Sequence, residues 1–275
     1  RRRPGPSRRR SPSCYFLRLH LVPFFGSMRL DEIGPAEIER YKALKQEEEQ
    51  GPRSINNHLI ALRKLLSLAV EYRKLDRAPK VKALKFGEQD FEFLTFEEAE
   101  RFLAAATPDW KPMVLLALKT GLRRGELLAL KWEDIDLKAG KMIVKRSLWE
   151  KEEGTPKSGK RREIPLSAQT VAMLSGHRHL KGPYVFCDAA GKRLTASRVL
   201  DVVAGICKKA GLSKRLSWHD LRHTFASHLV MRGRSLVEVQ QLLGHSTITM
   251  TMRYAHLSPD VVRAAVDALD MPVAT

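Results

Sequence analysis

The sequence is poor in cysteine and in acidic residues, and it contains no long hydrophobic run. Its three cysteines, Cys14, Cys187 and Cys207, lie far apart and form neither a CxxC pair nor a Cys/His cluster, which argues against a disulfide framework and a zinc site. No apolar stretch approaches the about 18 residues of a membrane span, and the N-terminus lacks the apolar core of a signal peptide. These absences predict a cytoplasmic protein with reduced thiols, no metal and no membrane partner.

The charge balance is strongly basic. The chain has 49 Lys+Arg against 31 Asp+Glu, a formal net charge of +18. Such an excess favours a polyanionic partner through counterion release and long-range attraction, so we expect nucleic acid. Ribosomal and other basic proteins share this charge, and composition alone names no activity. The length of 275 residues and 43% hydrophobic content are sufficient for two domains with cores of their own.

The first part of the chain divides into a basic arm and a helical region. Residues 1–13 are almost wholly Arg, Pro, Ser and Gly, which predicts a disordered arm that contacts phosphates, or an artefact of the reading frame. The chain begins with Arg rather than Met, as expected of a fragment or an imperfectly assigned reading frame. Residues 14–85 have helical periodicity, with Ser54 as the expected N-cap of a second long helix. Five basic residues on these helices are expected to meet DNA, although a solvated helix surface has the same pattern: Lys42, Lys45, Arg53, Arg63 and Lys64.

Residues 86–93, with Gly87, lose the helical period and are expected to link two domains. Beyond them, Thr95 and Glu98 predict a capping box and a helix to Ala106. A helix from Pro112 to Gly121 and another from about Gly125 follow. Strands are expected at 141–149, 161–166 and 184–186, with a turn at 154–160, and helices at 197–210, 220–232, 235–243, 247–254 and 259–270. The predicted fold is mainly α with a small antiparallel β-sheet.

Candidate chemistry lies in four segments, none of which is specific alone. They are 120–127 with Arg123, the basic turn around Lys157, 219–223 with His219 and Arg222, and 243–256 with His245 and Tyr254. An HxxR sequence on a helix puts both side chains on one face, which most often is merely a solvated face. The ordered combination of Arg, Lys, His, Arg, His and Tyr is far more specific.

The tract from Thr120 to His256 contains three motifs: His219-Asp220-Leu221-Arg222-His223, Leu243-Gly244-His245 and Arg253-Tyr254-Ala255-His256. With these motifs, the tract resembles the catalytic domain of the tyrosine recombinases or phage integrases. Upstream, Pro23-Phe24-Phe25-Gly26 and the next two helices resemble the family's SAM-like core-binding domain, without part of its first helix. The resemblance implies a DNA-binding domain at 14–85 and a catalytic domain with the DNA breaking-rejoining fold at 94–275. The two are expected to close around duplex DNA as a C-shaped clamp.

The resemblance also implies a role for each residue. Arg123 and Arg222 stabilise the charge on the phosphate, as paired guanidinium groups can without a metal or other cofactor. His219 transfers a proton, His245 donates to the phosphate, and Tyr254 attacks the phosphorus to form a 3′-phosphotyrosine. Lys157, or Lys160 if the hairpin is shifted, protonates the leaving 5′ oxygen. Glu126 supports Arg123, and Lys160 and Arg161 are further DNA contacts.

The expected function is site-specific recombination of double-stranded DNA, as the integrase of a mobile element. The resemblance implies that the protein is a monomer in solution and a homotetramer on DNA, with residues 259–270 docked into a neighbouring protomer. It also implies accessory DNA-bending or directionality factors, and a location at the nucleoid in the cytoplasm. Alternatives are a chromosome or plasmid dimer resolvase, a binding-only or degenerate integrase, a type IB topoisomerase and a DNA-binding regulator. The target sequence does not follow from one sequence, because base readout depends on geometry.

Overall fold

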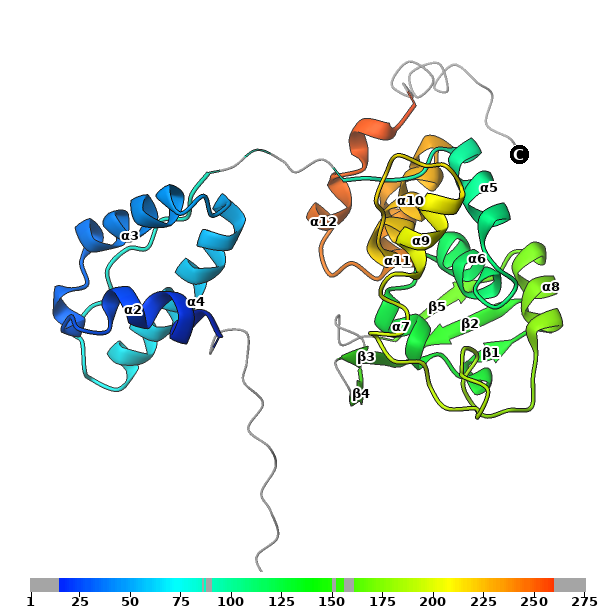
Figure 1. Ribbon diagram of the computed structural model, residues 1–275, viewed down its shortest axis with the longest axis horizontal. Helices are drawn as coiled ribbons and strands as arrows, with labels where there is room; N and C mark the ends of the chain where they lie inside the picture. Colours follow the sequence, from blue (N-terminus) through cyan, green and yellow to red (C-terminus); the bar gives the residue numbers. More distant parts are fainter. Residues whose placement is uncertain (1–14, 86, 88–90, 150–151, 156–160, 260–275) are drawn as a thin grey trace, which may run out of the picture. The chain divides into compact units, whose positions relative to one another are not determined.

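The computed structural model describes residues 15–85, 87, 91–149, 152–155 and 161–259. The chain divides into two compact units, Arg1–Gln89 and Asp90–Thr275, called here the N-terminal and C-terminal units (Figure 1). The division falls within the segment 86–93 that the sequence marks as a linker. The expected arm at 1–13, Lys157, Lys160 and the expected helix 259–270 beyond Pro259 lie outside the described residues.

The described part of the N-terminal unit is built from helices. They are η1 (Leu17–Leu21), α2 (Val22–Phe25), η2 (Leu30–Glu32), α3 (Pro35–Glu47) and α4 (Pro52–Glu71). Apolar residues three or four apart on α4, among them Ile55, Leu59, Leu62 and Leu66, bury one face against Tyr41 of α3. Removing this apolar surface from water is what holds the small unit together.

The start of α4 corrects one prediction from the sequence. The helix begins at Pro52 with Gly51 as its N-cap, so the expected N-cap at Ser54 is wrong. Proline is favoured in the first helical turn because its fixed φ suits the helix and its missing N–H has no helical partner there. Near the same end of α4, Asn56 exchanges hydrogen bonds with the backbone of Leu84, at 3.0 and 2.8 Å, which hold the segment that follows α4 against this helix.

The C-terminal unit combines helices with two small antiparallel sheets. Its elements are α5 (Phe96–Ala105), α6 (Lys111–Thr120), α7 (Arg124–Ala129), η3 (Trp132–Asp134), β1 (Ile135–Asp136), β2 (Lys141–Val144), β3 (Ser147–Trp149), β4 (Glu152–Gly154), β5 (Arg162–Pro165), α8 (Ala168–His177), α9 (Val202–Lys209), α10 (Trp218–Met231), α11 (Leu236–Leu243), α12 (Thr249–Met252) and η4 (Ala255–Leu257). Strands β1, β2 and β5 form one sheet in that order, and β3 pairs with β4 (Figure 1). Mainly helical structure with a small antiparallel sheet is the fold class that the sequence predicts.

Two hydrophobic clusters fill the C-terminal unit. The larger joins α5, α6, α7, the three-stranded sheet and the N-terminal part of α10, with Phe102, Leu116, Met142 and Trp218 among its members. The smaller lies between α10, α11 and the segment after α12, and its buried members are Phe225, Ala226, Val230, Val239, Leu243 and Tyr254. Helix α10 therefore belongs to both clusters and places its side chains between them.

Some elements differ from the prediction. Tyr184 makes only an isolated bridge with Lys131, so the expected strand at 184–186 is wrong. The helix expected at 197–210 begins only at Val202, and α8 was not expected at all. Helix α5, in contrast, has the expected capping box, in which Thr95 Oγ1 accepts from the backbone N–H of Glu98 at 3.2 Å.

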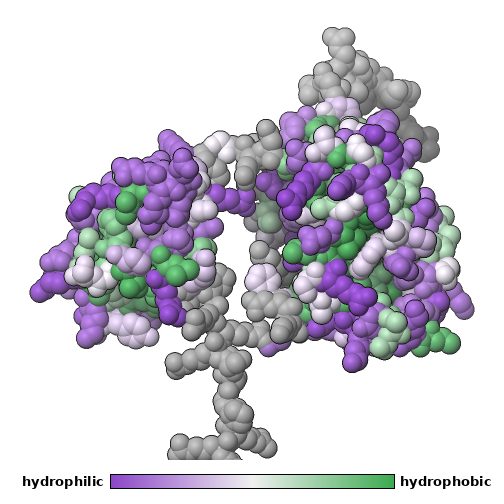
Figure 2. Space-filling view, in the orientation of Figure 1, coloured by the Kyte–Doolittle hydropathy of each residue, from purple (hydrophilic) through white to green (hydrophobic). Residues whose placement is uncertain are grey.

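Hydrophilic side chains predominate on the face of each unit seen in Figure 2. Of the helices that the structure describes, none combines the length and the apolar content needed to span a membrane.

Candidate functional site

Arg222 is the buried centre of the candidate site. It lies on α10, three residues after His219, and is only 1% exposed. Its Nη1 donates to the carbonyl oxygen of Gly121 and its Nη2 to that of Leu243, both at 2.6 Å. A guanidinium group has five N–H donors, so these bonds fix its position and leave three donors for an anion. Burial, and then the charge of Arg123, lower the pKa of Arg222 to about 9, and the group stays protonated at neutral pH.

The turn between α6 and α7 brings Arg123 close to Arg222. Gly121 ends α6 in the left-handed conformation, with φ 61°. A Cβ atom at this position would lie 2.4 Å from a ring carbon of Phe225 and 2.8 Å from Leu243, so only glycine fits. Two residues later, Arg123 is the N-cap of α7. The same glycine thus makes the turn and presents its carbonyl oxygen to Arg222.

Glu126 is a buried carboxylate that organises two arginines. It accepts from Nη1 and from the backbone N–H of Arg123, at 3.0 and 2.9 Å. Arg162 donates to both of its oxygens, from Nη1 at 3.0 Å and from Nη2 at 2.7 Å. Burial alone would raise the pKa of Glu126, but the hydrogen bonds and charge of Arg162 outweigh it and the pKa is lowered. Glu126 is therefore an anion that holds guanidinium groups in place.

Arg162 is a residue that the sequence analysis did not single out. It begins β5, and its Nε also donates to the carbonyl oxygen of Leu242 at 3.0 Å. Arg162 therefore joins α7, the sheet and the end of α11. A signal was present in the sequence, because side chains alternate along a strand and Arg162 shares a face with the buried Ile164. Arg123 and Arg162 bind the Glu126 carboxylate, and Arg222 interacts electrostatically with all three. Three guanidinium groups and one carboxylate leave an excess of positive charge suited to a phosphate.

His245 follows directly after α11. Gly244 ends the helix with φ 64°, and a Cβ there would lie 2.9 Å from the Arg162 side chain. The ring Nδ1 of His245 lies 2.9 Å from Thr251 Oγ1, which leaves Nε2 for another partner. Burial, followed by the charges of Arg222 and Arg123, lowers the pKa of His245 to about 3. The ring is neutral at neutral pH, and with Thr251 donating to Nδ1 its Nε2–H is a donor for an anion.

Tyr254 lies between the short helices α12 and η4 and is fully buried, at 1% exposure. Its hydroxyl lies 2.7 Å from Nδ1 of His223, on the same helix as Arg222. Burial raises the pKa of Tyr254 to about 12, although the charges of Arg222 and Arg253 act in the opposite direction. His223 is a second residue that the sequence analysis passed over, although it lies one helical turn after His219 and so on the same face of α10.

His219 is in the first turn of α10, at the surface of the unit. Its ring meets that of His223 edge to face, with 4.7 Å between centroids. Partial desolvation, followed by the charge of Arg222, lowers the pKa of His219. The ring is therefore largely neutral at neutral pH and is able to take up a proton.

The predicted DNA-contacting residues have varied surroundings. Lys42 and Lys45 of α3 are largely buried, and their ammonium groups bind Glu39 and Glu48 at 2.7 and 2.8 Å, so neither meets the expectation of an exposed cation. Arg63 is exposed but donates to the carbonyl oxygen of Val81 at 2.7 Å. Three others are exposed: Arg53, Lys64 and Arg161. The candidate lysines at 157 and 160 lie outside the described residues.

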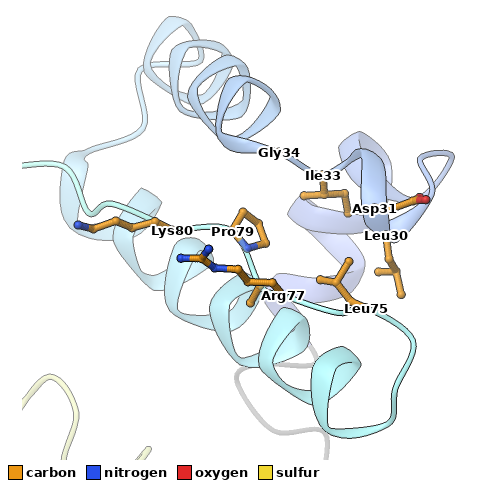
Figure 3. A pocket seen from close by; sticks show the side chains of 9 residues that line it. Leu30, Asp31, Ile33, Gly34, Leu75, Arg77, Pro79 and Lys80 are labelled. Carbon is orange, nitrogen blue, oxygen red and sulfur yellow. The ribbon is translucent and has the colours of Figure 1, made fainter.

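A groove in the N-terminal unit is separate from these residues (Figure 3). It lies between the turn that enters α3 and the segment after α4. Asp31 lines one side, and Arg77 and Lys80 line the other, next to apolar residues such as Ile33 and Leu75. This mixture of opposite charges does not define a particular ligand.

Comparison with known proteins agrees with the geometry. Residues 92–260 match the phage integrase family. The chain is 26% identical over 246 residues to tyrosine recombinase XerD of Listeria innocua, covering 83% of this chain and 80% of that protein. It is 30% identical over 238 residues to the integrase of Escherichia phage P2, covering 86% of this chain and 64% of that integrase.

The fold is also similar to a solved structure. The integrase of the transposon Tn1549, in complex with transposon right end DNA, has a TM-score of 0.80 at 22% identity, covering 94% of this chain and 92% of that one. The match to the family extends over most of the C-terminal unit, including Arg123, Arg222 and Tyr254. The chain therefore belongs to the phage integrase family and is a tyrosine site-specific recombinase that acts on DNA.

Proposed function

We propose that this recombinase cleaves DNA with Tyr254 as the nucleophile and forms a 3′-phosphotyrosine bond. The observation that carries the proposal is the position of Tyr254 on a helical segment packed against α10, which also bears His219 and Arg222. Its hydroxyl is bonded to His223 of that same helix. Nucleophile and phosphate-binding groups therefore belong to one small part of the C-terminal unit.

The scissile phosphate binds to Arg123, Arg222 and His245 in this proposal. The transition state of phosphoryl transfer carries charge on the nonbridging oxygens, and fixed N–H donors stabilise that charge most when they need not reorganise. Arg222 is fixed by two carbonyl oxygens and Arg123 by Glu126, so both are held before DNA arrives. His245 adds a neutral donor.

The covalent step then conserves the energy of the phosphodiester. The Tyr254 oxygen forms a bond to phosphorus, the bond from phosphorus to the 5′ oxygen breaks, and the phenol proton passes to His219. The 5′ oxygen takes a proton from Lys157, or from Lys160 in a shifted hairpin. Rejoining reverses these steps with a 5′ hydroxyl from another strand.

The test uses duplex DNA with a nick close to the scissile phosphate, taken from the sequences that flank the locus. Covalent protein–DNA adducts are separated on a denaturing gel after incubation without metal and without ATP. We expect a 3′-linked adduct for the wild type and for Tyr72→Phe, whose tyrosine is exposed, and none for Tyr254→Phe. An adduct that persists in Tyr254→Phe refutes the assignment of the nucleophile.

We also infer that the N-terminal unit contacts the duplex and that strand exchange takes place in a tetramer. The exposed Arg53 and Lys64 of α4 and Arg161 of the C-terminal unit are proposed phosphate contacts. The segment 259–270 is proposed to dock into a neighbouring protomer. Analytical ultracentrifugation with and without a cognate duplex tests this, and a protein that stays monomeric on paired sites contradicts it.

The biological role has two candidates. Integration of a mobile element is the role that the sequences of the motifs favour, and similarity to the integrase of phage P2 supports it. Similarity to XerD and XerC proteins supports resolution of chromosome or plasmid dimers instead. A plasmid with two directly repeated candidate sites distinguishes the roles, because a dimer resolvase converts it into two circles, whereas an integrase requires two different attachment sites.

A further inference from the structure

The backbone of strand β3 lies against the first turn of α7. A Cβ atom at Gly125, the second residue of α7, would lie 2.4 Å from the carbonyl oxygen of Leu148 and 2.7 Å from Oγ of Ser147. Glycine is the residue that permits such a close approach of two backbone segments. Because Arg123 is the N-cap of α7, β3 touches this helix only two residues after Arg123.

The side chain of Leu148 fixes β3 to the interior of the unit. It is 8% exposed and belongs to the large hydrophobic cluster, which also contains Leu127 and Leu128 of α7. Strand and helix therefore share one core, and the place of β3 does not depend on its pairing with β4 alone.

Arg146, directly before β3, fixes the start of the strand. Its Nη1 donates to Oδ2 of Asp134 at 2.5 Å, and the Asp134 side chain is only 2% exposed. The same guanidinium group also binds Glu133 of η3, and its Nε lies 3.4 Å from a carboxylate oxygen of Glu153 on β4. A buried carboxylate is costly to leave without its partner, so the pair with Asp134 holds the start of β3 against η3.

Arg123 consequently has two different supports. Glu126 binds its guanidinium group at 3.0 Å and fixes the end of the side chain. The starting point of the side chain is set by the backbone at the beginning of α7, and β3 lies against that backbone at Gly125. With a Cβ atom at position 125, β3 or the first turn of α7 would have to move by more than half an ångström.

We propose that β3 is the support that sets the position of Arg123, and that Gly125 and Arg146 are positioning residues of the reaction. The inference rests on the proposed function, in which Arg123 binds the scissile phosphate. Gly125 permits the contact between strand and helix, and Arg146 holds the strand in place for it. Neither acts on the phosphate directly. A shift of β3 or of the first turn of α7 moves the Arg123 guanidinium away from the phosphate.

The test compares two DNA substrates in single-turnover assays of adduct formation by the full-length protein at saturating DNA. One has an ordinary phosphate at the scissile position, and the other has a methylphosphonate, in which a methyl group replaces one nonbridging oxygen. The methylphosphonate has no negative charge, so its reaction depends much less on a guanidinium group. A misplaced Arg123 therefore slows only the phosphate substrate, whereas a general loss of structure slows both substrates.

Each variant has a matched control. Gly125→Ala adds the Cβ atom, and Gly205→Ala makes the same change within α9, where a Cβ atom meets nothing within 4 Å. Arg146→Gln removes the charge that binds Asp134, and Arg101→Gln makes the same change at an exposed position of α5. Tryptophan fluorescence verifies that each variant is folded, and Arg146→Gln carries the test if Gly125→Ala does not fold.

We expect Gly125→Ala to slow adduct formation on the phosphate about tenfold, because a misplacement of about 1 Å costs about 10²-fold and the expected shift is smaller. Arg146→Gln should slow it about fivefold for the same reason. On the methylphosphonate both variants should stay within about twofold of the wild type, and both controls should do so on either substrate.

A double-mutant cycle gives a second readout on the phosphate substrate. Arg123→Ala alone should slow adduct formation by about 10²–10³-fold. In this background there is no guanidinium left to misplace, so Gly125→Ala and Arg146→Gln should each cost less than about twofold more. This cycle decides the question by itself if the wild type does not cleave the methylphosphonate.

Several outcomes overturn the inference while the proposed function stands. These are an unchanged rate on the phosphate in both variants, equal slowing on the two substrates, and an equal loss with and without Arg123. If Arg123→Ala forms the adduct as fast as the wild type, or the wild type forms none on Tyr254, the proposed function itself fails and the inference falls with it.

Discussion

Replacing Arg162 by alanine should destabilise the C-terminal unit more than any surface substitution. The change removes two hydrogen bonds to the carboxylate of Glu126 and one to the carbonyl oxygen of Leu242. Breaking a buried ion pair from one side costs about 3–5 kcal/mol, because the remaining charge is left uncompensated. Arg123 still binds Glu126 through its side chain and backbone, so the lower limit of about 3 kcal/mol is expected.

The free energy of unfolding is measured in urea by tryptophan fluorescence. All four tryptophans, Trp110, Trp132, Trp149 and Trp218, lie in the C-terminal unit, so the signal reports on that unit. Arg161→Ala is the matched control, because Arg161 is the preceding residue and is exposed. Its change should stay within about 0.5 kcal/mol, as is usual at the surface.

A double-mutant cycle isolates the pair. The Glu126→Gln background has no carboxylate at position 126 to be left uncompensated. Arg162→Ala should therefore lower the free energy of unfolding by at least about 1.5 kcal/mol less in this background than in the wild type, because hydrogen bonds to charged groups contribute about 1.5–3 kcal/mol. Equal costs in both backgrounds, or a cost in the wild type no larger than that of Arg161→Ala, would refute the role given to Arg162.

Three further predictions concern the site. Arg222→Lys keeps the charge but not the planar set of donors, so the rate of adduct formation in single-turnover assays should fall by about 10²–10³-fold. A decrease of less than about tenfold in this rate contradicts the role of Arg222 at the phosphate. Thr251→Val removes the hydrogen-bond partner of His245 Nδ1 and should slow adduct formation about fivefold. The DNA affinity in gel-shift titrations should be unchanged. An unchanged rate of adduct formation would show that this hydrogen bond does not orient the His245 ring. The pKa of Glu126 is lowered in the folded state, so its stabilisation is complete above its ordinary pKa of about 4.5 and is lost as the pH falls through the lowered value. Urea unfolding followed against pH should show this acid loss in the wild type and a shallower one in Glu126→Gln.

The parts of the fold that depend on local sequence were predictable. Thr95 and Glu98 satisfy each other's backbone groups within one turn, and Gly121 ends α6 because no other residue fits its backbone conformation. The start of α4 was misjudged because Pro52 and Ser54 both suit a helix start, and the proline took the first turn with Gly51 as cap. Helix α8 was missed because it buries only Thr170 and Leu174, so its apolar pattern is weak.

The family was predictable from motifs in the sequence, and the match over residues 92–260 confirms it, whereas the roles given to Arg123, Arg222 and Tyr254 stay predictions. Partners distant in sequence were not predictable. Arg162 meets Glu126 across 36 positions and His223 meets Tyr254 across 31, and such pairs depend on how the strands and helices pack. Burial of Lys42 and Lys45 could not be predicted either, because a lysine packed beneath an exposed glutamate and a solvated lysine have the same sequence pattern.

The separation of the two hydrophobic clusters in the C-terminal unit affects how the protein opens. Tyr254 belongs to the small cluster with α11, whereas the helices behind Arg123 belong to the large one. Proteins open locally in cooperative units, and a small cluster needs less free energy to open than the whole domain. Backbone amides of α11 and α12 should therefore exchange with deuterium well before those of α6. In the proposed function, Tyr254 can therefore move during each reaction cycle while α6 and the turn that carries Arg123 remain folded.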